Sequence, residues 1–305
     1  MKTLFHSLLP AILFSLAAGS APAQRLFTTP EEASQALVSA EEHNDSTELL
    51  KILGSSAKDL VVSGDEIQDT RRRERFVAMA KESLKVAPDP ANNEQLLVSV
   101  GKDEWPLPIP LVKTSGGYRF DAAAAQVEIL ARRIGHNELH TIETLRQLVD
   151  AEREYAYSDL NKNGMRDYAQ RFVSTPGKHD GLYWEQSGEP ESPLAALVEE
   201  AAAEGYELIT NAQPSPYHGY VFRILKAQGP DAAGGAHEYV VRGDMIGGFA
   251  ILAYPIEYGV TGVKTFLVSH VDTVWEKDLG AQTKAIASAI KRYNPDKTWQ
   301  ESPHE

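Results

Sequence analysis

The 305-residue sequence contains no cysteine. This absence excludes disulfide bonds, thiol catalysis, a lipid-modified N-terminal cysteine and zinc sites built from thiolates. The sequence also lacks a long apolar run after the first 23 residues. The rest of the chain is therefore expected to contain no integral membrane segment.

The N-terminus has the three parts of a secretory signal peptide. Lys2 supplies the positive end, residues 4–18 form the apolar core, and Ala21-Pro22-Ala23 is a small-x-small cleavage site. The apolar core is shorter than the roughly 20 residues that span a bilayer. We expect cleavage after Ala23 and a periplasmic or secreted mature protein.

Acidic residues outnumber basic ones, 43 to 30, which gives a formal net charge of −13. An acidic surface argues against nucleic acid and against anionic lipid as partners, and no other partner is indicated. The one basic run, Arg71-Arg72-Arg73, is flanked by acidic residues at 65, 66, 69 and 74. We interpret this run as a solvated, charge-balanced face and not as an anion site.

Residues 24–135 show a pattern of helices followed by short strands. Capping signals at Thr29 and Asp45 begin two helices, and a third is expected from about Asp69 to Leu84. Strands are expected at 96–100, 105–111 and 118–120, followed by a helix that begins after Asp121 and ends at Gly135. Prolines at 106, 108 and 110 remove alternate N–H donors, so that segment is predicted to be an edge strand.

Residues 136–294 show a second set of helices and strands. We expect a long helix from Asn137 to about Ala156, a short one near residues 193–203 and a terminal one around residues 285–290. Between the last two helices, strands are expected at 220–227, 239–241, 248–254, 263–268 and 271–275. Residues 295–305 are expected to be a frayed tail. The predicted fold class is α+β, with two domains, each with helices packed on a small antiparallel sheet.

One loop has the spacing of a calcium site. Gly164 and the candidate ligands match the first part of an EF-hand loop; these ligands are Asp159, Asn161, Asn163, Met165 and Asp167. The bidentate Glu expected at the last position is Gln170. Calcium is thus a possible cofactor, and an Asx-rich turn explains the same residues. His136 and His140 lie four apart at a helix start, which we interpret as a surface pair and not as a zinc site.

Two loop segments gather histidine and aromatic residues that suit a ligand pocket. The candidate ligand-binding residues are His179, Asp180, Tyr183, Trp184, Tyr217 and His218. Buried aromatics that pin the loops in place explain the same residues. No Gly-x-Ser-x-Gly and no phosphate-binding glycine loop before a helix is present, so no catalytic residue is assigned.

Several long segments carry a family resemblance: "GKDEWPLPIPLVKTSGGYRFD", "REYAYSDLNKNGMRDYAQRFVSTPGKHDGLYW", "YHGYVFRILKAQGP" and "GGFAILAYPIEYGVTGVKTFLV". They resemble the bacterial exported family called domain of unknown function 2950. The resemblance implies export and this architecture but no reaction. The family's usual loop resembles Asp-x-Asp-Gly-Asp-Gly, and the asparagines at 161 and 163 and Gln170 depart from a strong calcium loop.

Two further resemblances concern parts of the chain. The N-terminal part resembles a cystatin-like or NTF2-like cone, and the C-terminal part looks pilin-like, although the processing site of a pilin is absent. Neither determines function. The leading hypothesis is a non-enzymatic, envelope-associated binding protein. The alternatives are an envelope hydrolase that uses a carboxylate with His179 or His218, and a calcium-stabilised structural module.

Overall fold

The computed structural model describes residues 23–185, 190–207 and 216–303. The predicted signal peptide, except for Ala23, lies outside these residues. No helix within the described ranges is both long and apolar enough to cross a bilayer.

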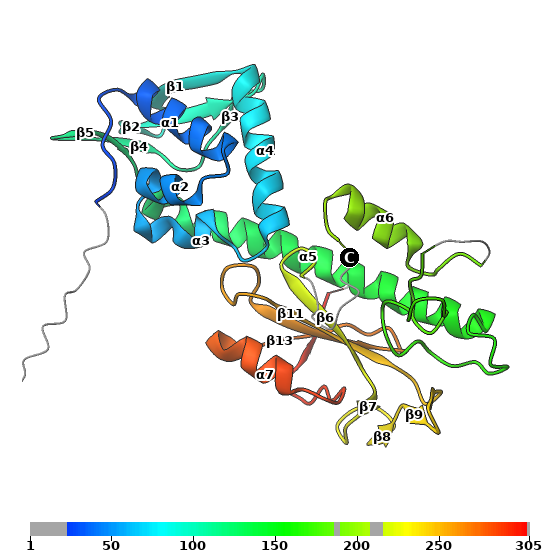
Figure 1. Ribbon diagram of the computed structural model, residues 1–305. Helices are drawn as coiled ribbons and strands as arrows, with labels where there is room; N and C mark the ends of the chain where they lie inside the picture. Colours follow the sequence, from blue (N-terminus) through cyan, green and yellow to red (C-terminus); the bar gives the residue numbers. More distant parts are fainter. Residues whose placement is uncertain (1–22, 186–189, 208–215, 304–305) are drawn as a thin grey trace, which may run out of the picture.

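The N-terminal lobe, residues 23–121, packs helices on an antiparallel sheet (Figure 1). The helical elements are α1 (Pro30–Glu42), α2 (Ser46–Leu53), the short 3₁₀ helix η1 (Ser55–Ala57), α3 (Lys58–Val61) and α4 (Glu66–Glu82). The strands are β1 (Leu84–Asp89), β2 (Asn92–Val100), β3 (Trp105–Pro106), β4 (Leu111–Thr114) and β5 (Gly117–Phe120). They are ordered β1-β2-β4-β5, with β3 paired to β2.

Local capping chemistry explains where the first helices begin. The Thr29 hydroxyl accepts a hydrogen bond from the Glu32 amide, and the Glu32 carboxylate accepts one from the Thr28 amide. The Asp45 carboxylate caps α2 in the same way through the Glu48 amide. These contacts satisfy N–H groups that have no partner within the helix.

The structure corrects two local expectations in this lobe. Residues 84–89 form β1, a strand that the sequence analysis did not predict, so the third helix ends two residues earlier than expected. The proline-rich segment forms a strand only at Trp105–Pro106, and β4 starts at Leu111. Three alternate prolines remove too many donors for a continuous ladder, so the predicted edge strand is interrupted.

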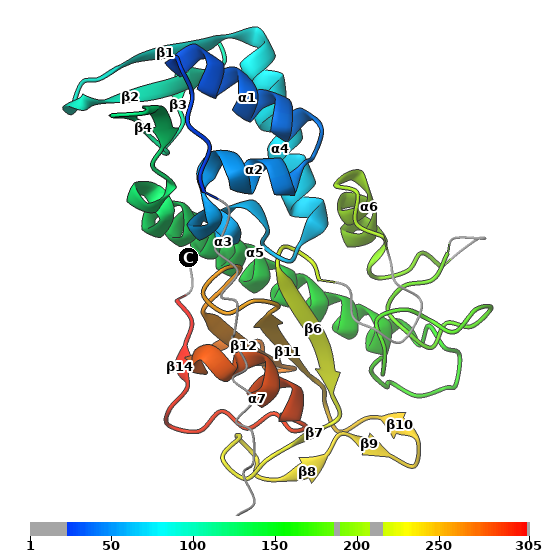
Figure 2. The same ribbon diagram turned by 60° about the vertical axis from the view of Figure 1, so that its left-hand side comes forward.

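Helix α5 (Ala122–Ser158) is continuous over 37 residues, or about 55 Å. The predicted helix end at Gly135 is wrong. Glycine costs only about 1 kcal/mol relative to alanine inside a helix, and the packing of α5 into both hydrophobic cores offsets this cost. Figures 1 and 2 show that α5 passes from one lobe to the other.

The C-terminal lobe, residues 159–303, places five strands on the side of α5 opposite to α4 and α6 (Ala195–Ala203) (Figure 2). The sheet order is β14-β13-β12-β11-β6, and all its pairings are antiparallel. The strands are β6 (Tyr220–Leu225), β11 (Ala250–Pro255), β12 (Lys264–Ser269), β13 (Trp275–Asp278) and β14 (Gln300–Glu301).

Short elements complete this lobe. They are β7 (Ala227–Gln228), β8 (His237–Glu238), β9 (Val240–Val241), β10 (Asp244–Met245), the 3₁₀ helix η2 (Gly280–Gln282) and α7 (Thr283–Ala289). Two expectations need correction here. The last predicted strand begins at Trp275 and not at residue 271. The tail is not frayed over residues 295–303, because β14 pairs with β13 and Trp299 is buried.

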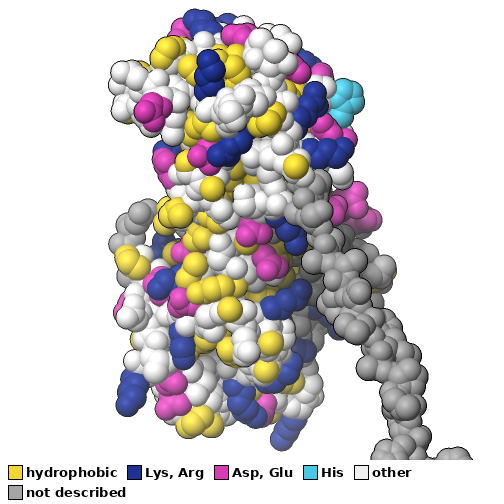
Figure 3. All heavy atoms as spheres, turned by 90° about the vertical axis from the view of Figure 1, so that its left-hand side faces the viewer, with side chains coloured by type: hydrophobic (Ala, Val, Ile, Leu, Met, Phe, Trp, Pro, Cys, Tyr) yellow, Lys and Arg dark blue, Asp and Glu magenta, His cyan; other side chains and the backbone are white. Residues whose placement is uncertain are grey.

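The fold is α+β, as predicted, and it has two hydrophobic cores. The first turn of α5 contributes Ala122 and Ala125 to the N-terminal core. Its C-terminal half contributes residues from Leu145 to Tyr155 to the other core. The helix thus belongs to both lobes, and the domain boundary near Gly135 stays a prediction. On the face shown in Figure 3, acidic and basic side chains are interspersed over both lobes.

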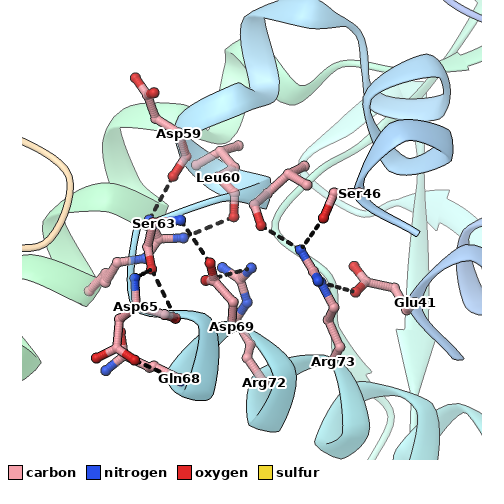
Figure 4. Close-up of polar contacts among 12 residues, drawn as sticks. Glu41, Ser46, Asp59, Leu60, Ser63, Asp65, Gln68, Asp69, Arg72 and Arg73 are labelled. Carbon is pink, nitrogen blue, oxygen red and sulfur yellow. Dashed lines mark hydrogen bonds and ion pairs between the residues drawn. The ribbon is translucent and has the colours of Figure 1, made fainter. Parts of the chain in front are cut away.

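Asp65 joins the two lobes. One carboxylate oxygen caps α4 through the Gln68 amide, as Figure 4 shows. The other accepts hydrogen bonds from the Tyr206 hydroxyl (2.9 Å) and the Gly219 amide (2.8 Å). Asp65 is 1% exposed, and this burial raises the pKa of its carboxyl group against the lowering effect of the hydrogen bonds.

The neighbouring contacts leave no room for a side chain at position 219. A Cβ on Gly219 would lie 2.7 Å from Thr261 Cβ and 2.9 Å from Asn137 Nδ2, and its φ is +76°. Asn137 bridges the lobes as well, since it accepts from the Gln68 side chain and donates to the Thr261 carbonyl. Asp65 therefore fixes α4 against Tyr206 and the 216–219 loop, and the Gln68–Asn137 contact fixes α4 against α5.

We predict that Asp65→Asn lowers the free energy of unfolding by about 2 kcal/mol. Asparagine caps a helix as well as aspartate does, but its amide group must then face one of the backbone or hydroxyl donors. Urea denaturation of residues 24–305 measures the change. Asp45→Asn, which alters a cap that holds no second element, is the control and should change stability by less than about 0.5 kcal/mol. Equal effects of the two substitutions would contradict the bridging role.

Candidate functional site: an arginine-lined cleft between the lobes

A cleft of about 1270 Å³ lies where α4, α5 and the end of α6 meet. Five arginines line it: Arg71, Arg72, Arg75, Arg132 and Arg133. Three carboxylates line it as well: Asp69, Glu74 and Glu204. The charged side chains carry two net positive units, in a protein whose formal charge is −13.

Two of these arginines are held in place by the protein. Arg72 lies 3.4 Å from the Asp69 carboxylate (Figure 4). Arg133 donates to the main-chain carbonyls of Asp59 (2.6 Å) and Leu60 (2.9 Å). Burial, followed by repulsion from Arg72, lowers the pKa of Arg133 to about 10. Arg133 stays charged at neutral pH, so two guanidinium groups face the cleft close enough to repel each other.

Two of the other three arginines, Arg75 and Arg132, are more accessible. Arg71 is half-buried and donates to the Ala203 carbonyl at the end of α6. Arg132 is exposed and pairs with Glu128 one turn earlier on α5. Arg75 is exposed and makes no hydrogen bond or ion pair with any residue that the structure describes. Arg75 and Arg132 therefore keep donors for a ligand.

The structure corrects the interpretation of Arg71-Arg72-Arg73 as a solvated face. Arg73 is 5% exposed. It donates to the Ser46 hydroxyl and to the Val61 carbonyl, and it lies 3.4 Å from Glu41 (Figure 4). It also donates to the Asn44 side chain. Consecutive helical residues point in directions about 100° apart, so the run divides between the core and the cleft.

Three histidines form one wall of the cleft. The His140 and His218 rings stack with centroids 3.9 Å apart, and His136 lies 5.8 Å from His140. The sequence analysis paired His136 with His140 and did not predict a third imidazole. No group of three or more potential metal ligands is present in the described ranges. Stacked rings do not direct their nitrogens at one point, which fits that result.

His218 is the buried histidine of this wall. Burial, followed by the charges of His140, His136 and Arg71, lowers its pKa from 6.5 to about 3. The imidazole is therefore neutral at pH 7. Its Nε2 lies 2.9 Å from Glu204 Oε2, but the two groups are misaligned for a hydrogen bond. His218 also adopts a left-handed backbone conformation, with φ of +47°.

A second, apolar cavity of about 600 Å³ adjoins the cleft. Its walls include Leu148, Phe172, Leu194, Leu197, Val198 and Phe222. Ala202 and Tyr206 line both cavities. Tyr217 lines the apolar one, and its ring lies 4.4 Å from that of His218.

The candidate ligand-binding residues divide between two places. Tyr183 and Tyr217 line the apolar cavity, and His218 lines the cleft. The other three side chains lie on the same loop as Tyr183 but line neither cavity, and internal contacts hold them in place. His179 stacks on the buried Trp184 ring at 4.2 Å, and the Asp180 carboxylate accepts from the Thr175 amide and hydroxyl.

The residues of the predicted calcium loop turn toward one another and toward the loop backbone. The Asp159 carboxylate accepts from the Gly164 amide, and the Asn163 side chain accepts from the Met165 amide. The Asn161 side chain donates to Asp167, which is 6% exposed. These are the contacts of an Asx-rich turn, and calcium at this loop stays a prediction.

The sequence analysis missed most of the residues that form the cleft. Arg72 lies on α4, whereas Arg132 and Arg133 lie on α5. Glu204 follows α6, and His218 lies in the loop before β6. The only local signal was the basic dipeptide at 132–133, which resembles any solvated helix face. Long-range packing alone brings it opposite α4.

Comparison with known proteins gives one match. The profile of a family described as "Protein of unknown function (DUF2950)" matches residues 24–302. No curated protein and no solved structure matches the chain. The pilin-like and NTF2-like resemblances are therefore not confirmed.

We predict that His218→Asn reduces the loss of stability on acidification between pH 6.5 and pH 3. In the wild type, the unfolded chain binds a proton at position 218 near pH 6.5, whereas the folded chain does so only near pH 3. Stability therefore falls as pH falls through this window. Asparagine tolerates the left-handed backbone and does not titrate. Urea denaturation at several pH values measures both slopes, and equal slopes would contradict a buried neutral imidazole.

Proposed function

Because the chain belongs to the DUF2950 family, whose function is unknown, we propose a function from its own cleft. The protein is an extracytoplasmic, non-enzymatic binding protein for an anionic ligand. The observation that carries this proposal is the group of five arginines around a cleft of about 1270 Å³ in an otherwise acidic protein.

The electrostatics of the cleft favour an anion. Asp69 offsets part of the repulsion between Arg72 and Arg133, and an anion in the cleft would add attraction to both guanidinium groups. Arg75 and Arg132 would supply hydrogen-bond donors from two different helices. Guanidinium groups bind carboxylate and phosphate in a bidentate manner, so the expected ligand carries one of these groups.

The N-terminal sequence supports the proposed location. Residues 1–23 have the pattern of a cleaved signal peptide, and the mature chain has no cysteine to be kept reduced. The ligand would then be met in the periplasm or outside the cell. A cationic cleft in an acidic molecule also gives selectivity, because the rest of the surface repels anions.

The first test is titration of residues 24–305 with inorganic phosphate and pyrophosphate by calorimetry. We expect binding that weakens with added salt. The double variant R75Q/R132Q should bind at least about tenfold more weakly, since it removes two charge-assisted contacts. Both side chains are exposed, so the fold should be unaffected.

Arg153→Gln is the matched control, because Arg153 lies on the same helix, α5, but outside the cleft. It should bind as the wild type does. The proposal fails when no anion binds, or when the control loses as much affinity as the double variant.

A second candidate function rests on the His218–Glu204 contact in the same cleft. The imidazole is neutral at pH 7, and its Nδ1 has no hydrogen-bond partner. Both ring nitrogens are buried, so the ring would have to turn before Nδ1 took a proton from a water that attacks an ester or phosphoester bound by the arginines. As the ester bond breaks, the imidazolium would return that proton to the departing alcohol. The protein would then be an envelope hydrolase.

We expect this candidate to show hydrolysis of p-nitrophenyl acetate or p-nitrophenyl phosphate that His218→Asn reduces by about 100-fold or more. Glu204→Gln should reduce it less, because Glu204 would only orient the ring. Release of p-nitrophenol measures the rate. Wild-type rates equal to those of buffer would exclude these substrates and leave the binding function.

A further inference from the structure

We propose that the ligand of the cleft is an anionic amphiphile, whose alkyl chain occupies the adjoining apolar cavity. This inference rests on the proposed function, because the arginines hold the anionic head. It adds the chemical class of the rest of the ligand.

The two cavities meet on the last turn of α6 and the residues that follow it. Ala202 and Tyr206 contribute to the walls of both. Tyr217 and His218 are sequence neighbours on opposite sides of the same boundary, one lining the apolar cavity and the other the cleft. A molecule bound at the arginines thus has apolar surface directly beside it.

The lining of the second cavity suits an alkyl chain. Its aliphatic and aromatic walls come from α5, α6, β6 and the 172–183 loop. The charged residue in its lining is Glu207. A volume of about 600 Å³ lies within the range of small-molecule sites. Acidic Glu207 would disfavour a second anionic group there, which places the charge of the ligand in the arginine cleft.

The position of Asp65 keeps the two cavities together. Its carboxylate holds the Tyr206 hydroxyl and the Gly219 amide, so both the shared wall and the 217–218 corner are fixed from the N-terminal lobe. Tyr206 is 8% exposed and packs against the Tyr217 ring at 5.1 Å. The junction is therefore pre-formed on the described residues.

The test is calorimetric titration of residues 24–305 with inorganic phosphate, butyl phosphate and octyl phosphate, each below its aggregation concentration. Burial of each methylene should strengthen binding about fourfold. Ala201→Phe places a ring in the apolar cavity, which Ala201 lines, and should abolish this dependence on chain length without changing phosphate binding. Leu197→Gln should reduce it with little change in side-chain size.

Ala196→Phe is the matched control, because Ala196 is exposed on the same helix and lines neither cavity. It should behave as the wild type. Flotation with phosphatidylglycerol vesicles distinguishes binding of a monomeric amphiphile from binding of a membrane surface. We expect that the protein does not float with the vesicles.

The outcomes separate this inference from the proposed function. Phosphate binding with no gain from chain length overturns the inference and leaves the anion-binding function. No binding of any phosphate overturns both. A gain that Ala201→Phe and Leu197→Gln leave intact places the chain elsewhere and overturns the inference, and so does binding to vesicles without binding of octyl phosphate.

Discussion

The buried carboxylate of Asp65 is the contact on which the arrangement of the two lobes depends. It caps α4, and it accepts hydrogen bonds from the Tyr206 hydroxyl, which follows α6, and from the Gly219 amide, which precedes β6. A buried charge of this kind is tolerated only when its oxygens are hydrogen-bonded, so each partner must be in place at once. One side chain thereby holds α4 against Tyr206, which follows α6, and against the 216–219 loop.

Helix α5 gives that junction its frame. Its two ends belong to different hydrophobic cores, while its middle carries Arg132, Arg133, His136 and His140 along the cleft. Glu138 in the same stretch accepts from the Val263 and Lys264 amides and so attaches the helix to the sheet. Because one rigid helix spans both lobes, the cleft has a fixed floor.

The charges of the protein are divided unevenly. Interspersed acidic and basic residues cover the face in Figure 3, whereas the cleft gathers five arginines beside an apolar cavity. Arg72 and Arg133 repel each other, and Asp69 offsets part of this repulsion. A cluster of like charges in a cleft is typical of a site that binds an ion of opposite charge.

The sequence by itself determined the features that depend on neighbouring residues: the α+β class, the caps at Thr29 and Asp45, most strands of the C-terminal sheet and the family. Tertiary structure decided the rest. It carried α5 through Gly135, paired the tail with β13 and divided Arg71-Arg72-Arg73 between core and cleft. It also brought His218 against His140 and Arg133 opposite Arg72. Capping and periodicity act over a few residues, whereas these contacts depend on packing between residues far apart in the chain.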